Sequence, residues 1–253
     1  AKYLAAHRLD FLLLSGLQIG AGETVVYGKR DIEMSYLNPL MLYHVAEHHL
    51  GDRDNNTLFL NLSCTLLRGT RFYAEYFIDD MTSTESLTRY FGNKFAFMTG
   101  VLWSDPLGAR NLDLRFEYSR VEPFVYAHHD SLNIYTHYDK TIGHWLGPNS
   151  DSAWLLAARQ FGRDLRLEAS LERIRKGEGA ADTRARPAQG TVKQFLGGVV
   201  EKRYLAGLRL QEQVRRDLFV SVAYTYAHIR NAGRVEGLSG DDHLARFEIA
   251  YNY

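Results

Sequence analysis

The sequence predicts an all-β protein whose strands form an antiparallel transmembrane β-barrel. Apolar and polar residues alternate with a period of two through most of the 253 residues, which gives each segment one apolar and one polar face. The connections between these segments are alternately short and long, as the two ends of a membrane barrel require. No apolar run approaches the roughly 18 residues that a membrane-spanning helix needs, so the sequence excludes a helical membrane protein.

Composition narrows the class of protein further. Lys and Arg total 30, as do Asp and Glu, so the formal net charge is zero. A nucleic-acid-binding protein usually carries a basic excess, so we expect no nucleic-acid partner. The mean hydropathy of -0.30 still permits a membrane barrel, because alternation halves the hydropathy of each strand. The single cysteine, Cys64, excludes an intrachain disulfide.

The polar face of several predicted strands carries charges of both signs. In "NLDLRFEYSRV", Leu114 and Phe116 lie on one face, and Arg115 and Glu117 lie on the other. A soluble sheet exposes such a charged face to water, whereas a membrane barrel turns it towards a wet lumen. The residues expected on the lumen wall are Glu75, Asp79, Arg115, Glu117, Arg166 and Glu168. Mixed charges on adjacent strands can pair, which favours a plugged or narrow lumen over an open pore.

Alternation and turn residues together predict eleven strands. Their ranges are 2–14, 17–28, 56–67, 70–81, 93–104, 111–122, 152–162, 165–176, 201–214, 217–230 and 242–253. Each range has the length of a tilted strand that crosses a bilayer. Bacterial single-chain barrels have an even number of strands, whereas eleven is odd. We therefore expect residues 1–253 to be the C-terminal part of a single outer-membrane barrel domain.

Several motifs resemble one family of bacterial proteins. They are "HRLDFLLLSGLQIGAGETVVYG", "LNPLMLYHVAEHHLGDRDNN", "FYAEYFIDD", "LDLRFEYSRVEPFVY" and "HWLGPNSD", in this order along most of the chain. They are similar to motifs of the Wzi-like capsule-assembly proteins of the outer membrane. The resemblance implies a barrel of about eighteen strands, within the range known for such proteins. It also implies external helices that help to close the pore, and a lectin-like role in holding capsular polysaccharide at the cell surface.

The resemblance also sets the expected location and partners. The protein should lie in the bacterial outer membrane, in contact with its lipid and lipopolysaccharide and with capsular or extracellular polysaccharide. The barrel-insertion machinery is a further expected partner, because the chain ends on "FEIAYNY", an alternating strand that closes on an aromatic residue. The segment "KGEGAADTRARPAQGTVKQFLGG" departs from the family pattern, so the resemblance does not identify the sugar.

A short external helix is expected at about residues 39–49. Asn38 suits the N-cap and Pro39 the first helical position, and Leu42 and Val45 would pack the helix on the barrel mouth. The helix contains "HVAEH", which matches the H-x-x-E-H pattern of inverted zinc peptidases. That chemistry needs a third ligand and a helical scaffold that the sequence lacks, so we expect no metal.

The segment "VEPFVYAHHDSLNIYTHYDKTIGHWLGPNSD" is the richest in groups that recognise sugars. Aromatic rings can stack on the apolar faces of sugars, while imidazoles and amides bond to their hydroxyl groups. The candidate polysaccharide-binding residues are Tyr126, His128, His129, Tyr135, His137, Trp145 and Asn149. The alternative interpretation is an ordered loop whose aromatic residues pack against one another. For an acidic polymer, the basic residues Arg184, Arg186 and Lys193 offer a different contact.

No catalytic constellation is expected. Asp79 and Asp80 suggest the carboxylate pair of a glycosidase, but adjacent strand residues point to opposite faces and cannot flank one bond. Asp79 is expected in the lumen wall, and Asp80 at the headgroup level or paired with a neighbour. The sequence therefore favours a non-catalytic polysaccharide-binding protein with no cofactor. A channel or polysaccharide export pore is the alternative, followed by a soluble all-β lectin or enzyme.

Overall fold

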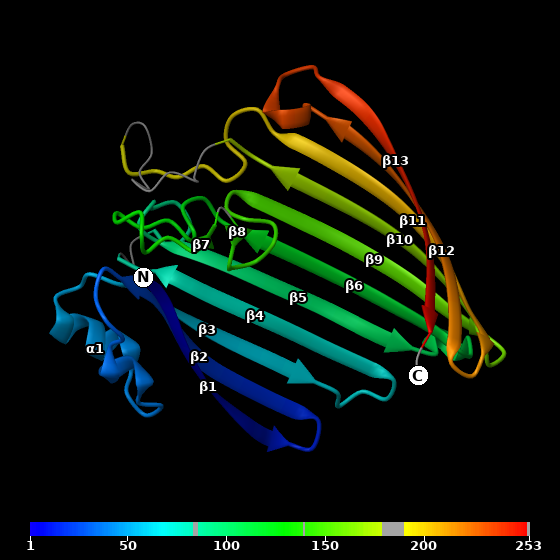
Figure 1. Cartoon of the computed structure of the whole chain (residues 1–253), viewed down its shortest axis with the longest axis horizontal. Helices are drawn as coiled ribbons and strands as arrows, with labels where there is room; N and C mark the ends of the chain where they lie inside the picture. The colour runs from blue at the N-terminus through cyan, green and yellow to red at the C-terminus, as the bar shows by residue number, and fades with distance from the viewer. Residues whose placement is uncertain (83–85, 139, 179–189, 252–253) are drawn as a thin grey trace.

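The computed structural model describes residues 1–82, 86–138, 140–178 and 190–251, and its main feature is one antiparallel sheet (Figure 1). The strands of this sheet are β1 (Lys2–Leu14), β2 (Leu17–Gly28), β3 (Asn55–Cys64), β4 (Thr70–Asp80), β5 (Lys94–Ser104), β6 (Leu112–Val121), β9 (Ser150–Phe161), β10 (Leu165–Lys176), β11 (Glu201–Arg215), β12 (Leu218–Arg230) and β13 (Ser239–Tyr251). All eleven predicted strands are confirmed within the described residues, with ends that differ by at most a few residues, and residues 252–253 of the last predicted range lie outside the described part of the chain.

The sheet has the simplest possible order, because each strand pairs with the next strand of the sheet along the chain. Figure 1 shows the tight turns gathered at one end and the long connections at the other, as the alternation of short and long connections predicts. A small hairpin, β7 (Thr136–His137) and β8 (Lys140–Thr141), lies within the connection from β6 to β9. Within the described residues, β1 and β13 are the two edges of the sheet.

The strand register divides the side chains between two continuous faces. On the face that we call outer, Leu60 lies opposite Tyr76, which lies opposite Phe97. On the inner face, Asn61 lies opposite Glu75, which lies opposite Met98. By the same register Arg115, Glu117, Arg166 and Glu168 share the inner face, and their place on a lumen wall stays a prediction.

The outer face exposes a broad apolar belt. Its exposed members on β10 to β13 include Leu171, Leu208, Leu210, Val222, Phe247 and Ile249. Exposed apolar side chains that cover several neighbouring strands indicate that this face contacts another apolar surface or phase. We expect that phase to be membrane lipid, which contacts the apolar face of transmembrane strands.

Replacing Val222 with arginine tests which face meets lipid. Val222 lies on the outer face between Leu210 and Phe247, whereas Thr225 lies on the inner face between Gly207 and Leu244. Val222→Arg should lower the free energy of unfolding in a bilayer by about 2–4 kcal/mol, because the charge would enter hydrocarbon. Thr225→Arg should change it far less. Urea unfolding of the full-length protein in vesicles measures both, and equal small effects would contradict a lipid-facing belt.

The predicted helix is confirmed within its expected segment, but it begins four residues later than expected. A 3₁₀ helix covers Met34–Leu37, and the α-helix α1 covers Tyr43–Leu50. Asn38 is extended and its side chain accepts a hydrogen bond from the backbone N–H of Leu40, so it forms a turn and is not the N-cap. The helix ends at Gly51, whose left-handed backbone (φ 89°) suits glycine.

Helix α1 packs on the outer face of β1 and β2 and does not cover the barrel mouth through Leu42 and Val45. Those two side chains are exposed, while Tyr43 and Ala46 are buried. Tyr43 stacks on His7 with ring centroids 4.1 Å apart, and its backbone N–H donates to Glu23 at 2.6 Å. The helical spacing of apolar residues was correct, but the buried side is set by the aromatic cluster it joins.

Candidate functional site

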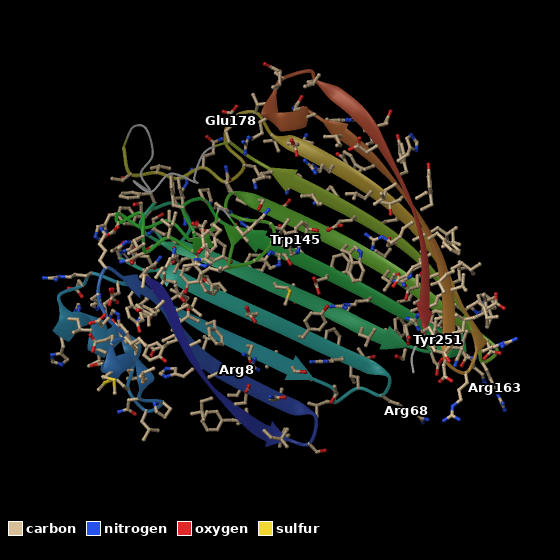
Figure 2. The ribbon with its side chains drawn as sticks, in the orientation of Figure 1. Arg8, Arg68, Trp145, Arg163, Glu178 and Tyr251 are labelled. Atoms are coloured by element: carbon tan, nitrogen blue, oxygen red, sulfur yellow. The ribbon has the colours of Figure 1, made fainter. Side chains whose placement is uncertain are left out.

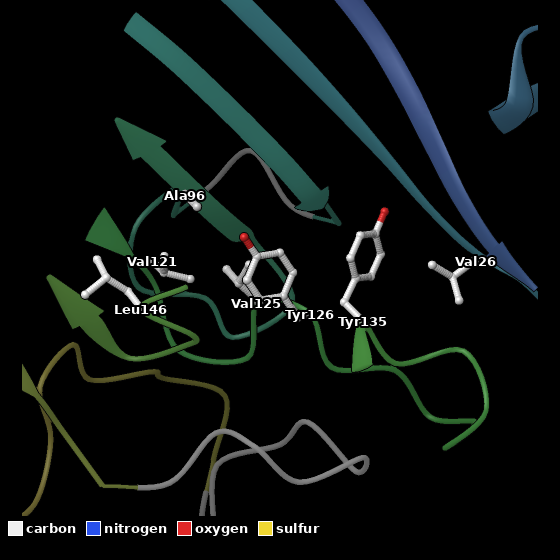
Figure 3. Close-up of a cluster of buried hydrophobic side chains, with 7 residues drawn as sticks. All are labelled: Val26, Ala96, Val121, Val125, Tyr126, Tyr135 and Leu146. Carbon is white, nitrogen blue, oxygen red and sulfur yellow. The ribbon is translucent and has the colours of Figure 1, made fainter. Parts of the chain in front are cut away.

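The connection from β6 to β9 (residues 122–149, the β6–β9 loop) folds back against the inner face of the sheet. Buried loop residues Val125, Tyr126, Tyr135 and Leu146 form one apolar cluster with strand residues Val26, Ala96 and Val121 (Figure 3). Phe77 and Ile174 pack against the same cluster. The loop that was expected to stand outside as a binding surface is therefore anchored over the inner face.

Tyr126 and Tyr135 are the anchors of this loop, so their expected role as stacking platforms is limited to the ring surface that lines a cavity beneath the loop. Their rings stack with centroids 5.4 Å apart, and both contact the ring of Phe77. Only 8% of Tyr126 and 3% of Tyr135 is exposed. The Tyr126 hydroxyl accepts a hydrogen bond from the backbone N–H of His144 at 2.9 Å, and the Tyr135 hydroxyl bonds with Thr57 at 3.0 Å.

Asp79 fastens the same loop to β4. Its carboxylate accepts a hydrogen bond from the backbone N–H of Tyr126 at 3.0 Å, and its side chain is buried beneath the loop. A register shift between Ile78 and Asp80 places Asp80 opposite Lys94, and Lys94 pairs with it at 3.6 Å. The expectation that strict alternation separates the two carboxylates fails at this shift, whereas the expectation that Asp80 pairs with a neighbour is confirmed.

A cavity of about 420 Å³ lies between the loop and the inner face. Its lining includes Arg8 of β1, Glu75 of β4, and Tyr126, Tyr135 and His144 of the loop. Burial lowers the pKa of His144, so its imidazole is neutral near pH 7 and can both donate and accept a hydrogen bond. The cavity therefore joins two aromatic rings to a cation, a carboxylate and a neutral imidazole.

The remaining predicted residues of the loop lie at its surface. Trp145 is 62% exposed and His137 and His129 are also exposed, while His128 is half-buried. Trp145 follows the cavity residue His144 directly, and its ring lies 5.7 Å from that imidazole. Figure 2 shows Trp145 among the long connections, at the end opposite Arg163. Trp145 is thus the one predicted stacking residue that is both exposed and next to the cavity.

His128 makes the loop sensitive to pH. Burial, with the neighbouring His129 and Lys94, lowers its pKa to about 4, and its Nδ1 accepts a hydrogen bond from the backbone N–H of Asp130 at 3.1 Å. The unfolded pKa of histidine is about 6.5, so the open loop binds the proton more readily than the closed loop. The contribution of His128 to the stability of the closed loop is therefore complete above pH 6.5 and is lost as the pH falls towards 4.

We expect amide hydrogen exchange in the β6–β9 loop to show this loss of stability. After correction for the intrinsic pH dependence, opening at Asn133 and Tyr135 should increase as the pH falls from 6.5 towards 4. His128→Gln should remove the part of that increase that His128 causes, because glutamine carries no titrating proton in this range, while His144, whose pKa is also lowered by burial, keeps its own part. A His129→Gln control changes an exposed neighbour and should retain it. Equal pH dependence in both variants would contradict the role of His128.

Asn149 has a structural role between two loops. It is 1% exposed, its amide donates to the carbonyl of Glu178 at 2.7 Å, and its side-chain oxygen accepts from the backbone N–H of Leu196 at 2.7 Å. Both partners belong to the connection from β10 to β11 (residues 177–200, the β10–β11 loop). Because the Asn149 side chain is buried and bonded to the protein, it is not available to a polymer. Its expected role in polysaccharide binding is therefore corrected to a structural one.

The basic residues that were expected to contact an acidic polymer are the second group of predicted binding residues. Lys193 is buried and pairs with Glu122 at 2.5 Å, so it joins the β10–β11 loop to the β6–β9 loop and is not available to an acidic polymer. Arg184 and Arg186 lie outside the described residues.

Charges on the inner wall form local networks. Arg115 donates to Glu117 at 2.9 Å and to the hydroxyl of Tyr73 at 2.9 Å, and that hydroxyl donates to Glu117 at 2.6 Å. Arg166 donates to Glu168 at 2.8 Å. These mixed charges do pair, but along single strands rather than between adjacent strands as expected.

The H-x-x-E-H segment of the predicted helix, residues 44–48, lies within α1. No group of three His, Cys, Asp or Glu side chains in the described part of the chain is placed to hold a metal ion. In the H-x-x-E-H segment, His48 instead contacts Asp52 at 2.5 Å. No helix among the described residues is long and apolar enough to cross a membrane.

An antiparallel sheet with an exposed apolar outer face and a charged inner face defines a class, the β-stranded proteins of the outer membrane. Within this class, the family model for capsule assembly protein Wzi matches residues 1–244, and the chain belongs to this family. No curated protein matches the chain. Among solved structures it is similar to OmpF of Salmonella typhi in complex with daunomycin, at 13% identity and a TM-score of 0.42. That similarity covers 93% of this chain and 61% of the OmpF chain.

Proposed function

We propose that this protein holds capsular or extracellular polysaccharide at the cell surface without converting it, and that the inner-face cavity binds a sugar unit. The observation that supports this best is the set of groups that line the cavity. Tyr126 and Tyr135 offer ring surface, while Arg8, Glu75 and His144 offer hydrogen bonds. The volume of about 420 Å³ lies within the range of ligand pockets. Family membership supports the choice of capsular polymer as the ligand.

The carboxylates favour binding over hydrolysis. Glu75 is the only carboxylate among the described residues that line the cavity. Glycoside hydrolysis generally uses two carboxyl groups on either side of the scissile bond. Asp79 is nearby in sequence but is not among the residues that line the cavity, and its carboxylate is buried beneath the loop, where one oxygen accepts from the backbone N–H of Tyr126. We therefore propose a lectin-like role for this cavity.

Retention of polymer by encapsulated cells tests the proposal. Arg8→Gln with His144→Ala removes two polar contacts of the cavity. A hydrogen bond from the Arg8 cation contributes about 1.5–3 kcal/mol, and one from the neutral His144 imidazole about 0.5–1.5 kcal/mol. We expect retention by the full-length protein to fall about tenfold or more. Arg68→Gln with Arg110→Ala is a matched control that alters the tight-turn end. Unchanged retention by normally inserted Arg8/His144 protein would contradict the proposal.

Two further measurements separate the alternatives. Loss of retention in Arg184→Ala with Arg186→Ala, and not in the cavity variant, would move the site to the β10–β11 loop. Large ion conductance of the full-length protein in a planar bilayer would favour the channel or export pore instead. We expect small conductance, because the β6–β9 loop packs over the inner face of the sheet.

A further inference from the structure

We propose that the outer face binds the phosphate of an outer-leaflet lipid headgroup at a basic patch formed by Arg173, Arg175, Lys202 and Arg230. The patch lies on β10, β11 and β12, near the long-connection end of the sheet (Figure 1). It is on the opposite face from the sugar cavity, so this inference goes beyond the proposed function and does not depend on it.

The strand register brings these cations together. Arg175 lies directly opposite Lys202, and Lys202 lies directly opposite Arg230, so three like charges occupy adjacent positions on three neighbouring strands. Side chains opposite one another have Cβ atoms about 4.5–5.5 Å apart, and like charges in such pairs are destabilising. An arrangement of this kind is stabilised by an anion that lies across it.

The protein supplies only part of that negative charge. Arg175 donates to Asp151 at 2.9 Å, so its charge is neutralised within the fold. Asp241 is engaged by His228 and the Tyr226 hydroxyl, each at 2.7 Å. Arg173, Lys202 and Arg230 form no ion pair with any residue that the structure describes. The patch therefore keeps a positive excess that faces outwards.

The basic patch lies beside the apolar belt, so the phosphate that it binds should belong to a lipid. Arg173 lies opposite Tyr204, and the Arg230 guanidinium lies 5.8 Å from the centre of the Tyr204 ring. The apolar belt begins at exposed Leu171 of β10. Leu171 lies two residues before Arg173, about 7 Å closer to the tight-turn end of the sheet. Aromatic residues flank the apolar band of membrane strands at the level of the headgroups. A phosphate on this patch would thus have its acyl chains over the belt.

The chemistry of the patch suits a phosphate monoester or diester. Guanidinium groups donate two parallel hydrogen bonds to phosphate oxygens, and an ammonium group adds a compact charge. Lipids of the outer leaflet that carry phosphate, such as lipid A, present this group at the boundary between water and hydrocarbon. A free phosphate ion would gain nothing from the adjoining belt, so we assign the lipid as the occupant.

Binding of lipid A to the full-length protein in detergent tests the proposal. The probes are lipid A with both phosphates, lipid A with both phosphates removed, and inorganic phosphate, with bound lipid counted by native mass spectrometry. Lys202→Gln with Arg230→Gln should weaken binding of phosphorylated lipid A about tenfold or more. Arg163→Gln with Arg216→Gln removes the same charge from tight turns at the other end and should leave binding unchanged. Lys202→Arg with Arg230→Lys keeps the charge and should keep most of the affinity.

The outcomes decide between the possible sources. Equal binding by wild type and the Lys202/Arg230 glutamine variant would overturn the proposal, as would equal binding of dephosphorylated lipid A. Competition by inorganic phosphate at the concentration of the lipid would assign the patch to free phosphate and overturn the lipid. If the double variant does not fold, the single Lys202→Gln and Arg230→Gln variants provide the same comparison. Polysaccharide retention should be normal in all of them, which separates this result from the cavity test.

Discussion

Replacing Tyr126 with alanine should release the β6–β9 loop from the inner face of the sheet. The Tyr126 ring contacts both Phe77 and Tyr135 and is 8% exposed, so its loss leaves a large cavity in the apolar cluster. Truncation of a buried aromatic side chain costs about 3–5 kcal/mol. The cost falls on local opening of the loop, because the strands keep their own hydrogen bonds.

Hydrogen exchange at two loop amides measures this opening. The N–H of Tyr135 bonds to the carbonyl of Tyr126 at 3.1 Å, and the N–H of Ile142 bonds to the carbonyl of Tyr135 at 3.0 Å. Both should exchange about a hundredfold faster or more in Tyr126→Ala. Tyr126→Phe is the matched control, because it removes only the hydroxyl that bonds to His144, and it should cost about 1 kcal/mol. Similar exchange in wild type and Tyr126→Ala would contradict the anchoring role.

Replacing Lys193 with alanine should separate the two long loops at their buried contact. The side chains of Lys193 and Glu122 are 1% and 8% exposed, so the substitution leaves a carboxylate without its buried partner. Removing one member of a buried ion pair costs about 3–5 kcal/mol. Arg120 also contacts Glu122 at 3.0 Å, which places the expected cost at the lower end of this range. Thermal unfolding and proteolysis of the β10–β11 loop in the full-length protein measure the effect.

A paired substitution separates the loss of charge balance from the loss of packing. Lys193→Met with Glu122→Gln removes both charges and keeps the volume of the side chains. It should recover part of the stability lost in Lys193→Ala, because replacing a buried pair by neutral groups is often close to neutral, although Glu122→Gln also removes the contact with Arg120. A double variant as unstable as Lys193→Ala would show that the ion pair is not what joins the loops.

The strands could be predicted because their cause is local. In β6, Leu114 and Phe116 must lie on one side and Arg115 and Glu117 on the other, whatever the rest of the chain does. The tight turns fix the strand ends, and a slip of one residue would turn the apolar face inwards. The same regularity predicted the charged inner face and the apolar outer belt.

The candidate site could be predicted only in part, because its contacts are long-range. The sequence indicated that Tyr126, Tyr135 and Trp145 belong to one aromatic loop, but not that the first two would pack against Phe77. Arg8 of the cavity was missed, although its place on the polar face of β1 was a signal. Helix α1 was shifted because Asn38 bonds locally in a turn, and local side-chain bonds compete with helix capping.

A structure of the full-length protein with a capsular oligosaccharide bound tests the central proposal most directly. The account predicts a sugar ring in the cavity between the β6–β9 loop and the inner face, in contact with Tyr126, Tyr135 and His144, with its hydroxyl groups bonded to Arg8 or Glu75. Saccharide bound only at the β10–β11 loop or elsewhere, with this cavity empty, would contradict it.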